Sequence, residues 1–139
     1  ARPMSYRVED RYEIRDLSAR YALATDARDF EAVGRLFSDD VVYGRIAGNE
    51  VMGRGRDAAV AHMRVHFGVH PTATFHYVHD VVIDFDAADA DRARGAVVSH
   101  AESGAQAGRE VHAVRYHDLY ERVGGRWLIA ERWLEFPLR

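Results

Sequence analysis

Residues 20–43 read RYALATDARDFEAVGRLFSDDVVY, and the sequence pattern changes three times within this stretch. Its beginning completes a helical stripe in which apolar residues recur at three- and four-residue steps, namely Ile14, Leu17, Tyr21 and Ala24. Asp29 is a favourable N-cap for a short second helix with an apolar face of Phe30, Val33, Leu36 and Phe37. The residues at 38–40, SDD, favour a turn, and VVY at 41–43 begins a strand. The stretch therefore predicts a helix, a short helix, a turn and a strand in succession.

The rest of the chain predicts one further helix and then only strands. Gly48-Asn49 predicts a turn between short strands at 41–47 and 50–52, and the alanine-rich segment 57–67 predicts a helix. Four later segments are rich in β-branched and aromatic residues and are separated by turn residues: 75–85, 94–102, 110–122 and 126–136. Helices followed by a meander of antiparallel strands predict an α+β fold, with the helices packed on one face of a curved sheet.

The length of 139 residues predicts a single domain over 1–139, in which we expect residues 1–7 to be flexible. The apolar fraction is 47%, and no segment approaches the roughly 20 consecutive apolar residues of a membrane span. The net charge of −3 comes from interspersed acidic and basic residues, a pattern that argues against nucleic acid as a partner. The absence of cysteine excludes disulfides and thiolate catalysis. Together with the lack of a signal-like N-terminal segment, it agrees with a cytoplasmic location.

The opening stretch 20–43 and the ending YHDLYERVGGRWLIAERW at 116–133 resemble the SnoaL-like branch of the NTF2-like superfamily. The resemblance extends over residues 8–136 and implies a cystatin-like cone, whose cavity is closed by helices and lined by the concave face of the sheet. Members of this superfamily include scytalone dehydratase, bile-acid dehydratases, polyketide cyclases, epoxide hydrolases and steroid isomerases. Such enzymes mostly use positioned acids and bases on hydrophobic small molecules, so the resemblance implies no metal and no organic cofactor.

Scytalone dehydratase is similar enough in its motifs to serve as a mechanistic template. The resemblance implies four catalytic residues, which are Asp26, Tyr43, His76 and His100. We expect substrate-binding residues at Tyr21, Thr25, His79 and Tyr116. Thr25 stands in place of a tyrosine of the template, and Tyr116 in place of an asparagine. A His–Asp pair suits general acid–base chemistry, because imidazole titrates near neutral pH and a carboxylate supports its protonated form. Tyr43 would donate a hydrogen bond to a substrate carbonyl or enolate.

The two histidines of the segment FHYVHDVVIDF at 75–85 cannot face the same way, because side chains alternate along a strand. Alternation alone groups His79 with the apolar residues at 81, 83 and 85, and would therefore direct it inward. The resemblance instead favours His76 as the histidine of the cavity. His100, on the following strand, could point into the same cavity or be partly exposed.

Three other patterns lead to expectations about metals and subunits. The histidines at 62, 66 and 70 have a spacing that can bind zinc, but no carboxylate completes the set, so we expect no metal. His112, near the start of its strand, is expected to be exposed. Trp127 and Trp133 are an even number of residues apart and are expected to share one face, packed on a helix or a second subunit. An open sheet with apolar residues on both faces also predicts a homodimer or homotrimer.

Together with the candidate catalytic residues, the resemblance implies a cofactor-independent dehydratase, cyclase or isomerase that acts on a hydrophobic cyclic small molecule, such as a polyketide or a steroid-like compound. The first alternative is the addition of water in the manner of an epoxide hydrolase, for which relatives use an Asp–Arg–Asp group. Arg115 lies on the opposite strand face from Tyr116, so an inward arginine is not evident. The second alternative is a non-catalytic module that binds a ligand.

Overall fold

The computed structural model describes residues 6–69, 72–105 and 108–138. The helices are α1 (Val8–Asp26), α2 (Phe30–Gly34) and α3 (Arg56–Val69), with a short 3₁₀ helix η1 (Ala47–Asn49) before the second strand. The strands are β1 (Phe37–Arg45), β2 (Glu50–Arg54), β3 (Ala73–Phe85), β4 (Arg92–Ala105), β5 (Gly108–Val123) and β6 (Arg126–Glu135). The predicted order of helices and strands is confirmed.

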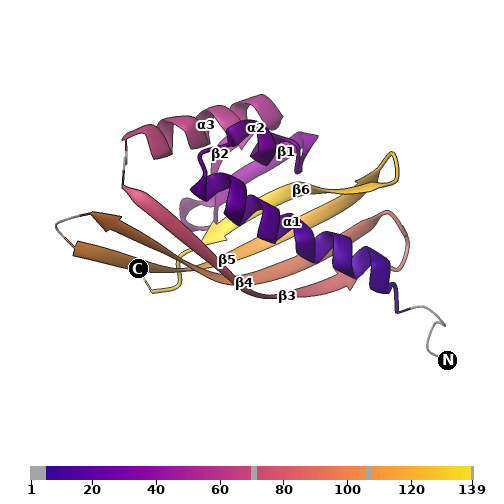
Figure 1. Ribbon diagram of the computed structural model, residues 1–139. Helices are drawn as coiled ribbons and strands as arrows, with labels where there is room; N and C mark the ends of the chain where they lie inside the picture. Colours follow the sequence, from indigo (N-terminus) through magenta and orange to yellow (C-terminus); the bar gives the residue numbers. More distant parts are fainter. Residues whose placement is uncertain (1–5, 70–71, 106–107, 139) are drawn as a thin grey trace.

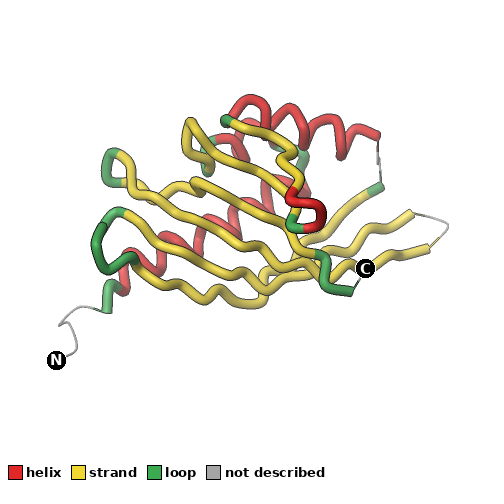
Figure 2. The backbone as a smooth tube through the Cα atoms, turned by 180° about the vertical axis from the view of Figure 1, so that it is seen from behind, coloured by secondary structure: helices red, strands yellow, loops and turns green. Residues whose placement is uncertain are grey.

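The strands form one six-stranded sheet in the order β2-β1-β6-β5-β4-β3. In Figure 1, α1 runs across one face of this sheet, and α3 with α2 lies at the end formed by β1 and β2. Figure 2 shows the sheet from behind, where α1 runs beyond the strands and no α-helix of the described chain lies in front of them. We call the helix-covered side the inner face and the other side the outer face. The arrangement confirms the predicted α+β fold with helices on one face of a curved sheet.

The sheet is mixed rather than wholly antiparallel, because β1 and β6 run parallel. After β1 and β2, the chain passes through α3 to the opposite edge and returns strand by strand from β3 to β6. Parallel neighbours need such a long connection, whereas antiparallel ones can be joined by a hairpin. The predicted turn at 38–40 is wrong. α2 ends at Gly34, and β1 already begins at Phe37, which pairs with Ile129 of β6.

Local signals at a helix start and at a hairpin are confirmed. The side chain of Asp29 accepts a hydrogen bond of 3.1 Å from the backbone N–H of Ala32, as an N-cap does. Gly124 and Gly125 have φ angles of 56° and 80° and form the two-residue turn between β5 and β6. Both angles lie in the left-handed region that glycine adopts without a steric penalty.

A β-bulge in β3 decides which of its side chains face inward. Val78 pairs with Ser99 and Asp80 with Val98, so His79 is an extra residue on the β3 side of the pairing. An extra residue reverses the alternation of a strand. Inner-face side chains of β3 are therefore even-numbered before the bulge and odd-numbered after it.

A second bulge lies in β6 at Ala130, where the register with β5 shifts. Because of it, the prediction that Trp127 and Trp133 share one face is wrong. Trp127 is buried on the inner face, where its Nε1 donates a hydrogen bond of 2.9 Å to Asp10 of α1. Trp133 lies on the outer face directly over Gly44, where a Cβ atom would come within 2.4 Å of the indole ring. Glycine is therefore needed at that position of β1.

Residues 1–7 were expected to be flexible, and residues 1–5 of this segment lie outside the described residues. Arg7 is held in place, because its guanidinium donates hydrogen bonds to Asp10 at 3.0 Å and to the backbone oxygen of Ala90 at 2.7 Å. Among the described helices, none has both the length and the apolar character needed to cross a membrane.

Candidate active site

Asp26 and His76 form a hydrogen-bonded pair between the end of α1 and the start of β3. Nδ1 of His76 lies 2.5 Å from Oδ1 of Asp26, and the backbone N–H of His76 donates a bond of 2.9 Å to Oδ2. An ionised carboxylate only accepts hydrogen bonds, so a neutral His76 that donates to it does so from Nδ1. The opposite nitrogen, Nε2, is then left with a free electron pair. Of the two histidines of β3, His76 is therefore the one that faces the cavity, since His79 lies on the outer face.

Two residues that sequence reasoning missed fix the carboxylate of Asp26. The hydroxyl of Thr74 donates a hydrogen bond of 3.1 Å to Asp26 and accepts one of 2.8 Å from Arg28. Arg28 also donates to the backbone oxygens of Thr25 and Thr72, at 2.8 and 2.9 Å. It thus ties the end of α1 to the start of β3. Arg28 has a φ angle of 58°, a left-handed value that is uncommon outside glycine and that no sequence motif announces.

The expectation that His79 and His100 share the cavity is wrong. Both rings lie on the outer face of the sheet, where Nε2 of His79 is 2.6 Å from Nδ1 of His100. The ring of His100 also stacks on Tyr77 with centroids 4.3 Å apart. The bulge at His79 sends this side chain outward, and the alternation of β4 sends His100 outward because Ser99 and Ala101 occupy the inner face.

A cavity of about 250 Å³ lies between α3 and the inner face, and His76 lines it. Its aromatic wall consists of Tyr21, Tyr43, Phe67, Tyr116 and Phe136. Further imidazoles come from His62, His66 and His112. Its polar and charged lining comprises Arg45, Thr72, Thr74, Glu102, Ser103 and Glu110. The site predictions for Tyr21, Tyr43, His76 and Tyr116 therefore coincide with cavity-lining positions.

Three buried tyrosines form the floor of this cavity. The hydroxyls of Tyr21 and Tyr43 are 2.8 Å apart, and the ring of Tyr116 meets that of Tyr21 edge-on with centroids 5.7 Å apart. Burial raises the pKa of Tyr43 to about 12 and also raises the pKa values of Tyr21 and Tyr116. At neutral pH all three are therefore hydroxyl donors rather than bases.

These pKa shifts predict how stability depends on alkaline pH. The pKa of Tyr43 is about 12 in the folded state against 10.0 for an ordinary tyrosine, so the unfolded chain loses its proton first. The contribution to stability is complete below pH 10 and is lost as the pH rises from 10 to 12. Urea unfolding at increasing pH, with tyrosinate absorbance followed in parallel, measures this loss. Tyr43→Phe should reduce the loss, and ionisation of all seven tyrosines in one step near pH 10 without unfolding would contradict it.

Beneath the tyrosines, Arg132 forms a fully buried ion pair with Asp118. Its guanidinium donates to both carboxylate oxygens, at 3.0 and 2.8 Å, and to the hydroxyl of Ser18 at 2.8 Å. The charged carbon lies 4.5 Å and 4.2 Å from the ring centres of Tyr21 and Tyr116. Burial alone would lower the pKa of Arg132, but the Asp118 carboxylate raises it above its ordinary value. An inward arginine thus exists, on β6 rather than at the Arg115 position of β5.

Other sequence predictions meet the structure less well. Thr25 is completely buried but does not line the cavity, so its expected place in the substrate site is wrong. His112 lines the cavity and lies 3.2 Å from Glu110, instead of being free in solvent. His70 lies outside the described residues. Within the described ranges, no group of three potential ligands could hold a metal ion.

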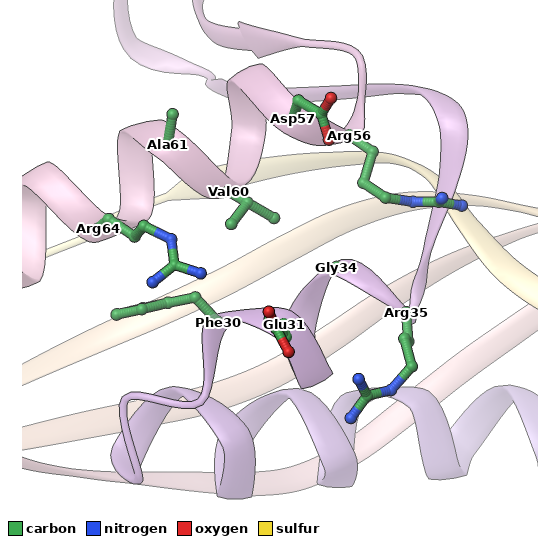
Figure 3. A pocket seen from close by; sticks show the side chains of 9 residues that line it. All are labelled: Phe30, Glu31, Gly34, Arg35, Arg56, Asp57, Val60, Ala61 and Arg64. Atoms are coloured by element: carbon green, nitrogen blue, oxygen red, sulfur yellow. The ribbon is translucent and has the colours of Figure 1, made fainter.

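A second depression lies outside the cone, between α2 and α3 (Figure 3). It measures about 490 Å³ and carries Arg35, Arg56 and Arg64, with the guanidinium of Arg64 above the ring of Phe30. Arg56 is engaged by Asp39 at 2.8 Å and by the backbone oxygen of Phe37. No acid–base pair like that of Asp26 and His76 lies in its lining, so the inner cavity is the candidate active site.

The chain belongs to the SnoaL-like domain family, because the profile of this domain matches residues 6–133. This match and the fold described above confirm the predicted NTF2-like, cystatin-like α+β cone. No curated protein matches the sequence.

Solved structures with the same fold come from proteins of several descriptions. Rv3472 of Mycobacterium tuberculosis, whose function is unknown, has a TM-score of 0.81 at 25% identity, over 94% of this chain and 77% of that one. A candidate scytalone dehydratase of Novosphingobium aromaticivorans has a TM-score of 0.79 at 21% identity, over 93% and 85%. The type 2 hexachlorocyclohexane dehydrochlorinase LinA has a TM-score of 0.78 at 20% identity, over 94% and 87%. The TM-scores of these three structures show that they share the fold of this chain.

Proposed function

We propose that this protein is a general acid–base enzyme that catalyses elimination, cyclisation or isomerisation on a hydrophobic cyclic small molecule. The observation that carries the proposal is His76 in the wall of an aromatic cavity, with its Nδ1 hydrogen-bonded to Asp26. Two proteins with the same fold are named a dehydratase and a dehydrochlorinase, names that denote loss of water and of hydrogen chloride. The proposed chemistry needs neither a metal nor an organic cofactor.

In the proposed reaction, Nε2 of His76 removes a proton from the carbon next to a substrate carbonyl. Asp26 stabilises the imidazolium that forms, because its carboxylate already accepts the Nδ1 proton. Tyr43, which its raised pKa keeps protonated, donates a hydrogen bond to the oxygen that becomes negative in the enolate. In an elimination, the enolate expels a leaving group from the next carbon, and the imidazolium returns its proton to that group. In an isomerisation, the proton returns to another carbon.

The dimensions of the cavity restrict the substrate. Its volume of about 250 Å³ is below the roughly 300–1,000 Å³ of typical small-molecule sites. One or two fused rings suit this space better than a steroid skeleton. The expected homodimer or homotrimer and the cytoplasmic location stay predictions.

Proton exchange in heavy water tests the proposal directly. Cyclic ketones of one or two rings, with and without a hydroxyl or chloride leaving group in the β-position, are incubated with the protein in D₂O. We expect deuterium at the α-carbon, loss of the leaving group, or both, detected by proton NMR. His76→Gln protein serves as the inactive control. Equal exchange by the wild-type and His76→Gln proteins, or none by the wild type across the series, would contradict the proposal.

Addition of water to an epoxide is less compatible with the site. Relatives of that type place an arginine between two aspartates around a water, but the guanidinium of Arg132 is engaged by Asp118 and Ser18 and does not line the cavity. Incorporation of ¹⁸O from labelled water into a diol would favour this alternative. A purely ligand-binding role would leave the His76→Gln protein with unchanged ligand affinity and the wild type without turnover.

A further inference from the structure

Three residues that line the cavity have a side chain with a formal charge at neutral pH: Arg45, Glu102 and Glu110. Each glutamate has a cationic or imidazole partner of its own. Glu102 lies 3.1 Å from the guanidinium of Arg109, and Glu110 lies 3.2 Å from Nε2 of His112. Arg45 has no such partner among the residues that the structure describes. An unpaired charge that lines a partly enclosed cavity is costly unless a ligand compensates it.

The position of Arg45 directs its guanidinium toward the cavity. It follows Tyr43 by two residues in β1, so the two side chains share the inner face. The guanidinium carbon lies 5.7 Å from the ring centre of Phe136, which lines the same cavity. Nε of Arg45 is buried and lacks a hydrogen-bond partner within the described chain. A buried N–H group without an acceptor costs free energy, and such groups are rare in folded proteins.

We propose that Arg45 binds a carboxylate of the substrate, so that the substrate class is hydrophobic cyclic carboxylic acids. The inference rests on the proposed function of the cavity as a substrate site. The planar guanidinium can donate two parallel hydrogen bonds to a carboxylate. A neutral hydrophobic ring would leave this charge without a partner.

The sheet order places the carboxylate and the reacting carbon at different ends of the substrate. Arg45 is on β1 and His76 on β3, and β6, β5 and β4 lie between these two strands. Both residues nevertheless line one cavity because the sheet is curved. The carboxylate is thus an anchor remote from the chemistry. Such remote binding positions a substrate against the catalytic groups without taking part in the reaction.

Isothermal titration calorimetry with an unreactive pair of ligands tests this inference. The probes are 2-naphthoate and its neutral counterpart 2-naphthamide, which have nearly the same shape. We expect the wild type to bind 2-naphthoate roughly 10- to 100-fold more tightly than the amide, in keeping with a charged hydrogen-bonded contact. Arg45→Gln should remove this preference, and Arg45→Lys should keep part of it. The far-ultraviolet circular dichroism of each variant confirms that it is folded.

Arg35→Gln is the matched control, because Arg35 is an exposed arginine of the depression between α2 and α3 and does not line the cavity. This variant should bind both probes as the wild type does. Equal affinity of the wild type for the two probes, no measurable binding of either, or an unchanged preference in Arg45→Gln would each overturn the inference. Neither probe can react, so the result is independent of turnover. Discrimination by Arg45 in a protein that fails the D₂O exchange test would refute the proposed reaction and leave the carboxylate site intact.

Discussion

Replacement of His76 with alanine is expected to lower kcat by about 10²- to 10⁴-fold, the range that a positioned general base contributes. His76 is the imidazole whose Nδ1 is fixed by a carboxylate and whose Nε2 is left to accept a proton. The tyrosines of the cavity cannot replace it, because their raised pKa values make them poor bases at neutral pH. Steady-state kinetics on a substrate found by the D₂O exchange test measures the effect.

Asp26→Asn should cause a loss of similar order, because an amide can donate a proton to Nδ1 and so favour the wrong tautomer of His76. The matched control is His79→Ala, which removes an imidazole from the same strand but from the outer face. Its kcat should stay within about twofold of the wild type, since it leaves the Asp26–His76 pair untouched. A His76→Ala protein with wild-type kcat, or a His79→Ala protein as impaired as His76→Ala, would rule out the assigned roles.

The difference between His76 and His79 shows what the sequence could predict and what it could not. The strand at 75–85 and the helices of the chain were predictable, because apolar periodicity and capping residues act over a few neighbouring positions. Which histidine faces inward depends on the bulge at His79, and a bulge is set by the register with β4. Simple alternation grouped His79 with the apolar residues after the bulge. That prediction was wrong because the bulge adds one residue to β3 and reverses the alternation.

The same physical reason explains the errors elsewhere. The bulge at Ala130 separates Trp127 from Trp133 and leaves Arg132 facing inward, so the buried charge of the core was missed. The support of Asp26 by Thr74 and Arg28 depends on contacts between residues about fifty positions apart. No local pattern announces such contacts. Family resemblance supplied Asp26 and His76, but the unpaired Arg45 became visible only once the lining of the cavity was known.

Replacement of Asp118 with asparagine is expected to cost about 3–5 kcal/mol of unfolding free energy, because it leaves the buried guanidinium of Arg132 without its counter-charge. Both side chains are completely shielded from solvent, and Tyr120 donates a further hydrogen bond of 2.6 Å to the same carboxylate. A domain of this size is typically stable by about 5–15 kcal/mol, so the variant would lose a large share of its stability. Urea denaturation followed by circular dichroism measures the difference.

Two comparisons make this second result specific to the buried pair. Glu135→Gln removes a half-exposed carboxylate that contacts Arg115 at 2.8 Å and His117 at 3.0 Å, and should cost no more than about 1 kcal/mol. The double replacement Asp118→Leu with Arg132→Met removes both charges together, and should recover much of the loss because no uncompensated charge stays buried. Tyr21 and Tyr116 flank the guanidinium, so the double variant should fold yet bind cavity ligands less tightly. A loss below about 1 kcal/mol in Asp118→Asn would show that Arg132 finds another partner or water, and that the pair does not hold the tyrosine floor of the cavity in place.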